Sequence, residues 1–273
     1  MNETIIKIIN LSFIDVFEEF NINFSKNKFT IITGPNNCGK TSLIRILARK
    51  YAYMGEIIVN DKNILDYKID DYYKMLNIVI PEEILFICDN YEDEISLLLT
   101  NVDQNTYKEL IKKLKLNKYK NQKIELLDTK TKIKIQLMIS LLSDNDIIII
   151  DDISTYYDKK EMVEIIETIK YIKEKTNKTI IMATSTLENS LYADYLYIVA
   201  NSQIILEGEP IEVLQKDNII NKVGLNVPFM IDLSVKLRDY DLIKEIELDM
   251  NRMVDTLWKW YLKIIHTKKK ILT

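Results

Sequence analysis

The sequence predicts an α/β fold in which helices cover both faces of a largely parallel β-sheet. Residues 29–33 form a β-branched and aromatic run that leads into a short loop and then into residues with helical apolar spacing. Four consecutive isoleucines at 147–150 are typical of a strand that is buried on both faces. Strand-like and helix-like segments continue to alternate after them, which is the pattern of an α/β fold.

The loop after the first of these strands fits the phosphate-binding pattern G-x-x-x-x-G-K-[ST]. With the serine that follows, its residues are Gly34, Pro35, Asn36, Asn37, Cys38, Gly39, Lys40, Thr41 and Ser42. In such a loop, backbone N–H groups and the N-terminus of the next helix converge on phosphate oxygens. We expect Lys40 to reach the β- and γ-phosphates and Thr41 to contact Mg²⁺. The pattern therefore predicts that the protein holds a nucleoside triphosphate.

The segments around this loop predict a second, smaller sheet. Residues 1–65 contain several short strands, including 56–59, and a polar turn at 60–63. We expect these strands to form a small antiparallel sheet beside the core. From about residue 81 to 142 the sequence is rich in Lys and Glu and helical in character, without an obvious strand.

The second half of the chain continues the strand and helix alternation. Apolar residues recur at helical spacing over 162–172, residues 179–183 read as another buried strand, and 197–199 with 203–206 read as a strand pair. Beyond about residue 215 the sequence changes character. We therefore expect a nucleotide-binding domain at 1–215, with a helical subdomain at about 81–143, and a C-terminal extension at 216–273.

Composition excludes several classes of protein. The net charge of −4 argues against a nucleic-acid binder, since such proteins usually carry a basic surplus. No apolar run approaches the roughly 20 residues that span a bilayer, and the N-terminus lacks the layout of a signal peptide. The two cysteines give neither a disulfide framework nor a metal-ligand set, which fits a reducing compartment. We expect a cytoplasmic protein, or one peripheral to the inner face of the membrane.

An acidic pair, Asp151 and Asp152, directly follows the isoleucine strand. Where such a strand lies beside a phosphate-binding loop, the first carboxylate orients hydrated Mg²⁺ and the second addresses the attacking water. Alone, the acidic pair is weak evidence for a site that hydrolyses a nucleotide. Together with the phosphate-binding loop it is strong evidence. The alternative is a strand-end cap without a catalytic role.

Several other segments follow a shared set of motifs. Residues 151–158 (D-D-I-S-T-Y-Y-D) resemble D-E-A-T-S-x-L-D, residues 91–95 resemble V-E-D-D-I, and residues 55–59 resemble G-E-I-x-V. The segment 193–210 resembles A-D-R-V-I-V-M followed by G-T-P, and residues 224–229 (G-L-N-V-P-F) are close to G-L-D-V-P-F. These are motifs of the ATP-binding-cassette (ABC) ATPases. Over nearly its whole length the chain resembles the ATPase subunits of energy-coupling factor (ECF) transporters, bacterial importers of vitamins and metal ions.

This resemblance implies a P-loop NTPase core of ABC type with an antiparallel β-subdomain, a helical subdomain and a small helical C-terminal extension. It implies ATP and Mg²⁺ as cofactors and transport-coupled ATP hydrolysis. The implied partners are a second ABC ATPase subunit, identical or different, which pairs head to tail and which Asp158 would contact, a transmembrane coupling component and a substrate-binding membrane component. The implied location is the cytoplasmic face of the membrane. An aromatic upstream of the loop, Phe13 or Phe17, would stack on adenine.

The family's signature motif L-S-G-G-Q is replaced in this chain. It corresponds to Leu127, Asp128, Thr129, Lys130 and Thr131. In the family this segment opens a helix and offers its hydroxyl and N–H groups to the γ-phosphate held by the partner subunit. A carboxylate about 4 Å from a phosphate would cost on the order of 1–4 kcal/mol at effective dielectrics of about 80 to 20, unless Lys130 offsets it. The alternative is that Asp128 is simply a helix N-cap.

Other catalytic positions also depart from the family. Ser185 stands where the family has its switch histidine, and the single histidine of the chain, His266, lies in the tail. No glutamine occurs between Met54 and Asp103, where the family has one that senses the γ-phosphate. Asp152 replaces the catalytic glutamate and is one methylene shorter, and a misplacement of 1 Å can cost on the order of 10²-fold in rate.

Three turn positions have lost an expected glycine, at Asn37, Asp61 and Ser202. We expect Asn37 to adopt a positive φ, which Asn tolerates better than most residues. The family's residues are lost at several catalytic positions, whereas Lys40 and Asp151 are kept. We therefore hypothesise that this subunit binds ATP, hydrolyses it slowly or not at all, and forms the degenerate half of a heterodimer.

Two other functions stay open from the residues. The first is a regulatory, nucleotide-sensing cassette protein without a role in transport. The second is a small-molecule kinase or another phosphate-loop enzyme, which needs an acceptor site and lid arginines. The arginines at 45, 49, 238 and 252 do not form a convincing lid.

Overall fold

The computed structural model describes the backbone of residues 3–271 and the side chains of residues 3–262. The chain folds into two compact units, one that ends at Pro210 and one that begins at Ile211. The sequence led us to expect a division between residues 215 and 216.

The larger sheet of the first unit has six strands within the described residues, in the order β10-β9-β3-β8-β7-β6. They are β3 (Phe29–Thr33), β6 (Leu76–Val79), β7 (Ile147–Ile150), β8 (Thr179–Thr184), β9 (Tyr195–Ala200) and β10 (Gln203–Gly208). Only the β9 and β10 pair is antiparallel among the described strands of this sheet. The α/β class, the three predicted buried strands and the late strand pair are confirmed.

The parallel strands bring distant segments of the chain to one edge of the sheet. In the register, Thr33 lies opposite Thr184, and Ile150 lies opposite Met182. The phosphate loop follows β3, the acidic pair follows β7, and Ser185 follows β8. Because adjacent parallel strands end at the same edge, these three segments gather there.

Strand β6 was not predicted from the sequence. It is only four residues long, lies at the edge of the sheet, and directly follows helix α2 (Ile69–Met75) without an intervening turn residue. Such a short run carries little periodic signal. The strand is held by its parallel pairing with β7, and the backbone N–H of Asp151 donates to the carbonyl of Val79 at 2.9 Å.

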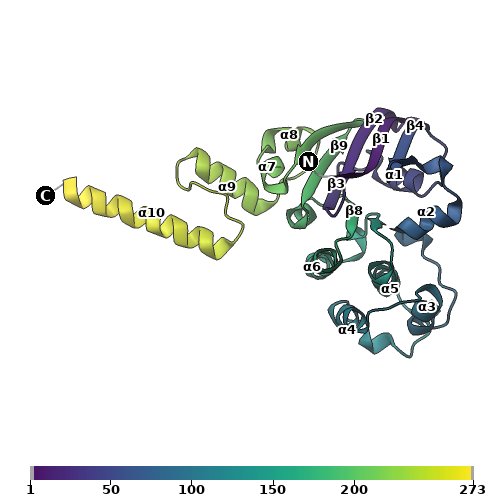
Figure 1. Cartoon of the computed structure of the whole chain (residues 1–273). Helices are drawn as coiled ribbons and strands as arrows, with labels where there is room; N and C mark the ends of the chain where they lie inside the picture. Colours follow the sequence, from purple (N-terminus) through teal and green to yellow (C-terminus); the bar gives the residue numbers. More distant parts are fainter. Residues whose placement is uncertain (1–2, 272–273) are drawn as a thin grey trace. The chain divides into compact units, whose positions relative to one another are not determined.

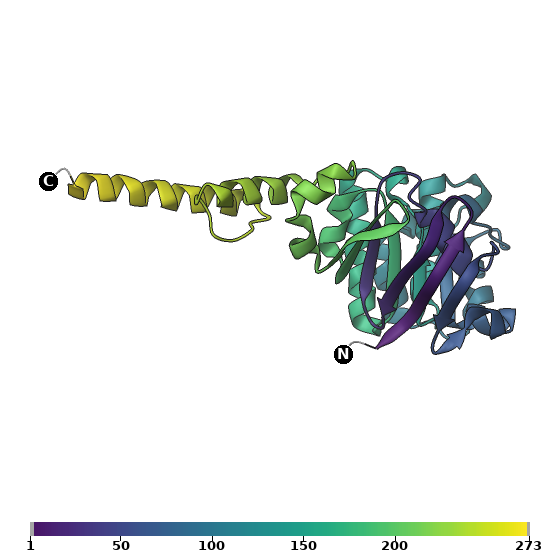
Figure 2. The same ribbon diagram turned by 90° about the horizontal axis from the view of Figure 1, so that it is seen from above.

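The smaller sheet is antiparallel, with the order β2-β1-β4-β5. Its strands are β1 (Thr4–Phe13), β2 (Phe17–Ser25), β4 (Met54–Val59) and β5 (Lys62–Asn63). Figure 2 shows β1 and β2 in purple as a long hairpin on this side of the unit. The predicted small antiparallel sheet is confirmed.

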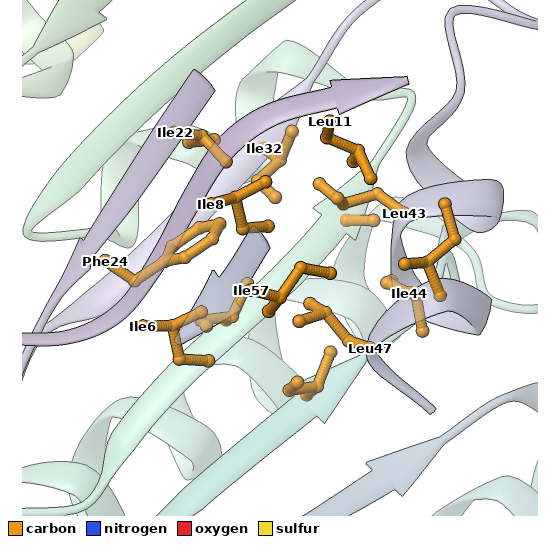
Figure 3. Packing of buried hydrophobic residues seen from close by; sticks show 14 of the residues in the cluster. Ile6, Ile8, Leu11, Ile22, Phe24, Ile32, Leu43, Ile44, Leu47 and Ile57 are labelled. Atoms are coloured by element: carbon orange, nitrogen blue, oxygen red, sulfur yellow. The ribbon is translucent and has the colours of Figure 1, made fainter. Parts of the chain in front are cut away.

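The main hydrophobic core lies where the smaller sheet, the larger sheet and helix α1 (Lys40–Leu47) meet. Its side chains are mostly isoleucine and leucine, and Figure 3 shows them pointing toward one another from β1, β2, β3, β4 and α1. The labelled members are Ile6, Ile8, Leu11, Ile22, Phe24, Ile32, Leu43, Ile44, Leu47 and Ile57. Since α1 begins at the end of the phosphate loop, this packing fixes the position of the loop.

The segment predicted to be helical contains helices and, within residues 81–142, no strand. The helices of this half of the first unit are α3 (Tyr91–Leu98), α4 (Gln104–Lys113), α5 (Thr129–Leu142) and α6 (Lys159–Thr176). Figure 1 shows α3 and α4 grouped with α5, away from the strands of the smaller sheet. The expectation of a helical character from about 81 to 142 is confirmed.

The residues that replace glycine in turns adopt the left-handed conformation. The φ angle is 65° at Asn37, 59° at Asp61 and 59° at Ser202. Asn and Asp tolerate this region because their short side chains can bond locally. Ser202 is fixed by a hydrogen bond from its hydroxyl to the carbonyl of Val16 at 2.7 Å. The chain therefore keeps turns of the glycine type without glycine.

The second unit is helical. Its helices are α7 (Pro210–Leu214), α8 (Asp217–Lys222), α9 (Phe229–Asp239) and α10 (Met250–Ile271). The hydroxyl of Ser234 donates to the carbonyl of Glu247 at 3.0 Å and accepts from its N–H at 3.1 Å, which ties the segment before α10 to α9. Among the helices of the described residues, none has both the length and the hydrophobicity to cross a bilayer.

Candidate nucleotide-binding site

The phosphate loop depends on two glycines for its shape. Gly39 has a φ of 98°, and a Cβ on it would lie 2.6 Å from the Phe17 ring. A Cβ on Gly34 would lie 2.1 Å from the carbonyl oxygen of Val199, which is backbone and cannot easily move. Any side chain at either position would therefore distort the loop, which explains the two glycines of the motif.

Lys40 and its neighbours line one cavity of about 530 Å³. The cavity is lined by Val16, Asn36, Asn37, Gly39, Lys40, Thr41, Ser42 and Asp152. The ammonium group of Lys40 donates to the carbonyls of Gly34 at 2.8 Å and Pro35 at 3.0 Å. The structure thus brings together most of the predicted loop residues and the second residue of the acidic pair. Cys38 is buried within the loop.

Thr41 and Asp151, the predicted metal-binding pair, lie in contact. The hydroxyl of Thr41 donates to a carboxylate oxygen of Asp151 at 3.1 Å, and the N–H of Asp152 donates to the same oxygen at 2.9 Å. Burial raises the pKa of Asp151 above its usual value. A hydroxyl and a carboxylate beside a phosphate loop fit Mg²⁺, which prefers oxygen ligands and usually keeps several waters.

We expect Asp151→Asn to stabilise the nucleotide-free protein and to abolish the Mg²⁺ dependence of ATP binding. Because the pKa of Asp151 is raised in the folded state, the ionised carboxylate costs stability above that pKa, and the cost disappears as pH falls below its unfolded value. Urea unfolding in EDTA should therefore give a higher free energy of unfolding for the variant than for wild type at neutral pH. This difference should shrink in acid. A variant less stable than wild type at neutral pH contradicts this prediction.

Asp152 is held by three donors. One carboxylate oxygen accepts from the N–H of Ser154 at 2.9 Å and from its hydroxyl, and the other accepts from the N–H of Ser185 at 2.8 Å. The predicted catalytic residues Asp152 and Ser185 are therefore brought together. Ser185 makes this contact through its backbone, so its side chain does not substitute for the proton-donating ring of a histidine.

Comparison with known proteins gives the family of this fold and site. The sequence profile described as ABC transporter matches residues 17–155, which span the phosphate loop and the acidic pair. The chain belongs to the ABC transporter family. The enzyme class that the sequence predicted, an ABC-type ATPase, agrees with this assignment, and ATP is the ligand that the family implies for the loop.

Relatives in the ABC transporter family support the resemblance to ECF subunits. The chain is 26% identical to the ECF transporter ATP-binding protein EcfA1 of Mycoplasma mobile, over 82% of this chain and 84% of the relative. It is 25% identical to EcfA1 of Mesomycoplasma hyopneumoniae, over 89% of this chain and 91% of the relative. The predicted resemblance to the ATPase subunits of ECF transporters is confirmed.

A solved structure supports the ABC fold. CbiO1 of Clostridium perfringens, described as part of the ABC transporter complex CbiONQ, superposes with a TM-score of 0.67 at 21% sequence identity. The match covers 85% of this chain and 98% of CbiO1. The predicted P-loop core of ABC type is confirmed.

The segment that replaces the ABC signature lies at the start of α5, outside the cavity. Asp128 is the N-cap of α5, and its carboxylate accepts from the N–H of Thr131 at 2.8 Å. Leu127 is buried, whereas Thr129 and Lys130 are exposed. Lys130 pairs with Glu161 at 3.0 Å. Asp128 therefore caps α5 as an N-cap residue would, while a contact of this segment with a second subunit's nucleotide stays a prediction.

Asp158, the predicted dimer-contacting residue, caps α6. Its carboxylate accepts from the N–H of Glu161 at 2.8 Å, and the Glu161 carboxylate accepts from the N–H of Asp158 at 3.3 Å. This reciprocal pair is a capping box. The side chain lies at the surface, and its contact with a second subunit stays a prediction.

Sequence analysis missed two residues at this site. Val16 lines the cavity from the turn between β1 and β2, a position with no motif to reveal it. Glu82 follows β6 outside the cavity lining, and its charge, after burial, contributes to the raised pKa of Asp151. It was missed because β6 was missed. Neither aromatic proposed for adenine lines the cavity, since Phe17 is buried against Phe20 and Phe13 stacks on Tyr51.

Proposed function

We propose that this chain is the ATP-binding subunit of an ECF importer and that it couples ATP binding and hydrolysis to the uptake of a vitamin or a metal ion. The observation that carries the proposal is one cavity lined by Lys40 and Thr41, with Thr41 bonded to Asp151. Relatives named as ECF ATP-binding proteins match this chain over most of their length. Mg²⁺ would be held by Thr41 and Asp151 and would neutralise charge on the triphosphate.

The proposed assembly contains a second ABC ATPase subunit, a transmembrane coupling component and a substrate-binding membrane component, at the cytoplasmic face of the membrane. CbiO1, which this chain resembles in fold, is described as part of a complex called CbiONQ. In such an assembly ATP would close the ATPase pair and hydrolysis would reopen it. The specificity for the transported substrate would lie in a different subunit.

We further propose that hydrolysis by this chain is impaired. Asp152 is shorter than glutamate, and both of its oxygens already accept hydrogen bonds from Ser154 and Ser185. A general base must reach the water that it activates, and a side chain directed toward two backbone N–H groups is restrained from doing so. Ser185 supplies only its backbone N–H to this contact.

An exposed apolar loop supports docking onto a membrane component. Leu85 is 87% exposed and Ile87 is 78% exposed, which is unusual for large apolar side chains. The loop is held in place because the buried carboxylate of Glu94 accepts from the N–H groups of Ile87 at 2.9 Å and Cys88 at 2.7 Å. Leu85 also lines a groove of about 240 Å³ beside Ile80.

We expect the double variant Leu85→Asp/Ile87→Asp to fold normally and to lose its membrane partner. Both side chains are exposed, so the substitutions leave the core intact, whereas two buried carboxylates would destabilise an apolar interface. The measurement is purification of the tagged chain from detergent-solubilised native membranes, with mass spectrometry of the bound proteins. Leu126→Asp, at a site 77% exposed, is the matched control.

The same purification separates transport from regulation. An ECF subunit should bring down a second cassette ATPase and a membrane protein in fixed ratio, and the double variant should keep the ATPase but lose the membrane protein. A wild-type chain that purifies without any membrane protein contradicts the transport proposal and favours a regulatory nucleotide-binding protein.

A further inference from the structure

The cavity beside the phosphate loop offers an aliphatic side chain, Val16, to a bound base. Val16 lines the cavity from the turn between β1 and β2, and a Cβ on Gly39 would lie 2.6 Å from its Cγ1 atom. Apart from Gly39, the other described residues of the lining have polar side chains. The base is the least polar part of a nucleoside triphosphate. Within the described lining, Val16 is therefore the side chain on which a base can pack.

The aromatic rings next to Val16 in the sequence make other contacts. Phe17 is 5% exposed and belongs to the main hydrophobic core, where its ring stacks on Phe20 with 4.7 Å between the centroids. Phe13 stacks on Tyr51 with 5.3 Å between the centroids and 9° between the ring planes. Neither ring lines the cavity. To reach a base, Phe17 would have to leave the core and Phe13 would have to leave its stack.

The backbone of Val16 is also engaged. Its N–H donates to the carbonyl of Phe13 at 3.0 Å, and its carbonyl accepts from the hydroxyl of Ser202 at 2.7 Å. Bases differ in the donors and acceptors along their edges, and both backbone groups of Val16 already have a partner. Asn36 and Asn37 also line the cavity, but both are exposed, and an amide offers a donor and an acceptor alike. Such side chains can bond to the edge of any base.

We propose that the base packs on Val16 and that the site holds nucleoside triphosphates by the triphosphate without selecting the base. The inference rests on the proposed function, because it takes this cavity as the nucleotide site. Lys40, Thr41 and Asp151 address phosphate and metal, which are the same in ATP, GTP and UTP. Stacking of a base on an aromatic ring gives about 5-fold to 150-fold in affinity. An aliphatic side chain gives contact area to every base without that gain.

Titration calorimetry of the full chain with Mg²⁺ and ATP, GTP or UTP tests the inference. We expect the three dissociation constants to lie within about fivefold of one another, because fivefold is about the smallest effect of one stacked base. Val16→Ala should weaken the binding of all three nucleotides by the same factor, since it removes contact area that does not depend on the base.

Two further variants locate the base. Val16→Tyr places a ring on the same wall, so it should bind ATP and GTP at least about fivefold more tightly than wild type does, with a smaller gain for UTP, whose base is smaller. Phe13→Leu is the matched control, because it removes an existing ring of the same turn that does not line the cavity. It should bind all three nucleotides like wild type. Urea unfolding shows whether each variant keeps its fold.

The possible results separate this inference from the proposed function. Wild type that binds ATP more than about fivefold more tightly than GTP or UTP overturns the inference and leaves the proposed function intact. The same holds if Phe13→Leu loses affinity for ATP alone, or if a folded Val16→Tyr gains no affinity for ATP and GTP, because the base then lies on another side chain. Absence of binding of all three nucleotides to wild type overturns the inference and the proposed function together.

Discussion

The variant Lys40→Ala is expected to lose at least about 100-fold in affinity for Mg-ATP while it keeps its fold. Hydrogen bonds to charged groups contribute about 1.5–3 kcal/mol each, and every 1.4 kcal/mol is about tenfold in affinity. Lys40 lines the cavity and donates to the loop carbonyls of Gly34 and Pro35, so it lies where we expect the triphosphate to bind. Titration calorimetry with Mg-ATP measures the loss.

The fold should survive this substitution because, apart from the two bonds that Lys40 makes to loop carbonyls, other contacts set the shape of the loop. Gly34 and Gly39 set the backbone, and α1 is packed into the main core by Leu43, Ile44 and Leu47 (Figure 3). The matched control is Lys50→Ala, since Lys50 pairs with Glu83 and does not line the cavity. Unchanged Mg-ATP affinity in Lys40→Ala would show that this loop is not the phosphate site.

The loop could be predicted from sequence because its chemistry is local. The strand, the two glycines, Lys40 and Thr41 follow one another within a few residues, and each has one physical reason to be there. The positive φ of Asn37 was predicted on the same ground. The strand of four isoleucines was equally clear, because a continuous β-branched run of this length is typical of a strand buried on both faces.

Contacts between strand ends could not be predicted in the same way. The bond between Asp152 and the N–H of Ser185 joins residues 33 positions apart, and only the pairing of β7 with β8 brings them together. Strand β6 was missed because its four residues carry little periodic signal, and it is stabilised by its neighbour rather than by its own sequence. The sequence therefore predicts most residues of the site but neither Val16 nor the bonds that restrain Asp152.

Those bonds set the second expected effect, in which Asp152→Glu hydrolyses ATP faster than wild type. Glutamate is one methylene longer than aspartate, so its carboxylate can extend past the N–H groups of Ser154 and Ser185 into the cavity that Asp152 already lines. Since a misplacement of about 1 Å can cost on the order of 10²-fold in rate, we expect a gain of up to about 10²-fold in kcat. The assay is phosphate release by the chain paired with its copurifying ATPase.

The gain in rate should come with a loss of stability. The longer side chain gives up hydrogen bonds that tie the segment after β7 to the segment after β8, so Asp152→Glu should unfold at a lower urea concentration than wild type. Asp152→Asn should bind ATP and release no phosphate above background, and Asp146→Glu, at an exposed site, controls for the added methylene. The contrary result is that wild type hydrolyses ATP rapidly through its own loop and that Asp152→Glu does not raise the rate. The restrained aspartate is then a competent base, and this subunit is not the impaired half of its pair.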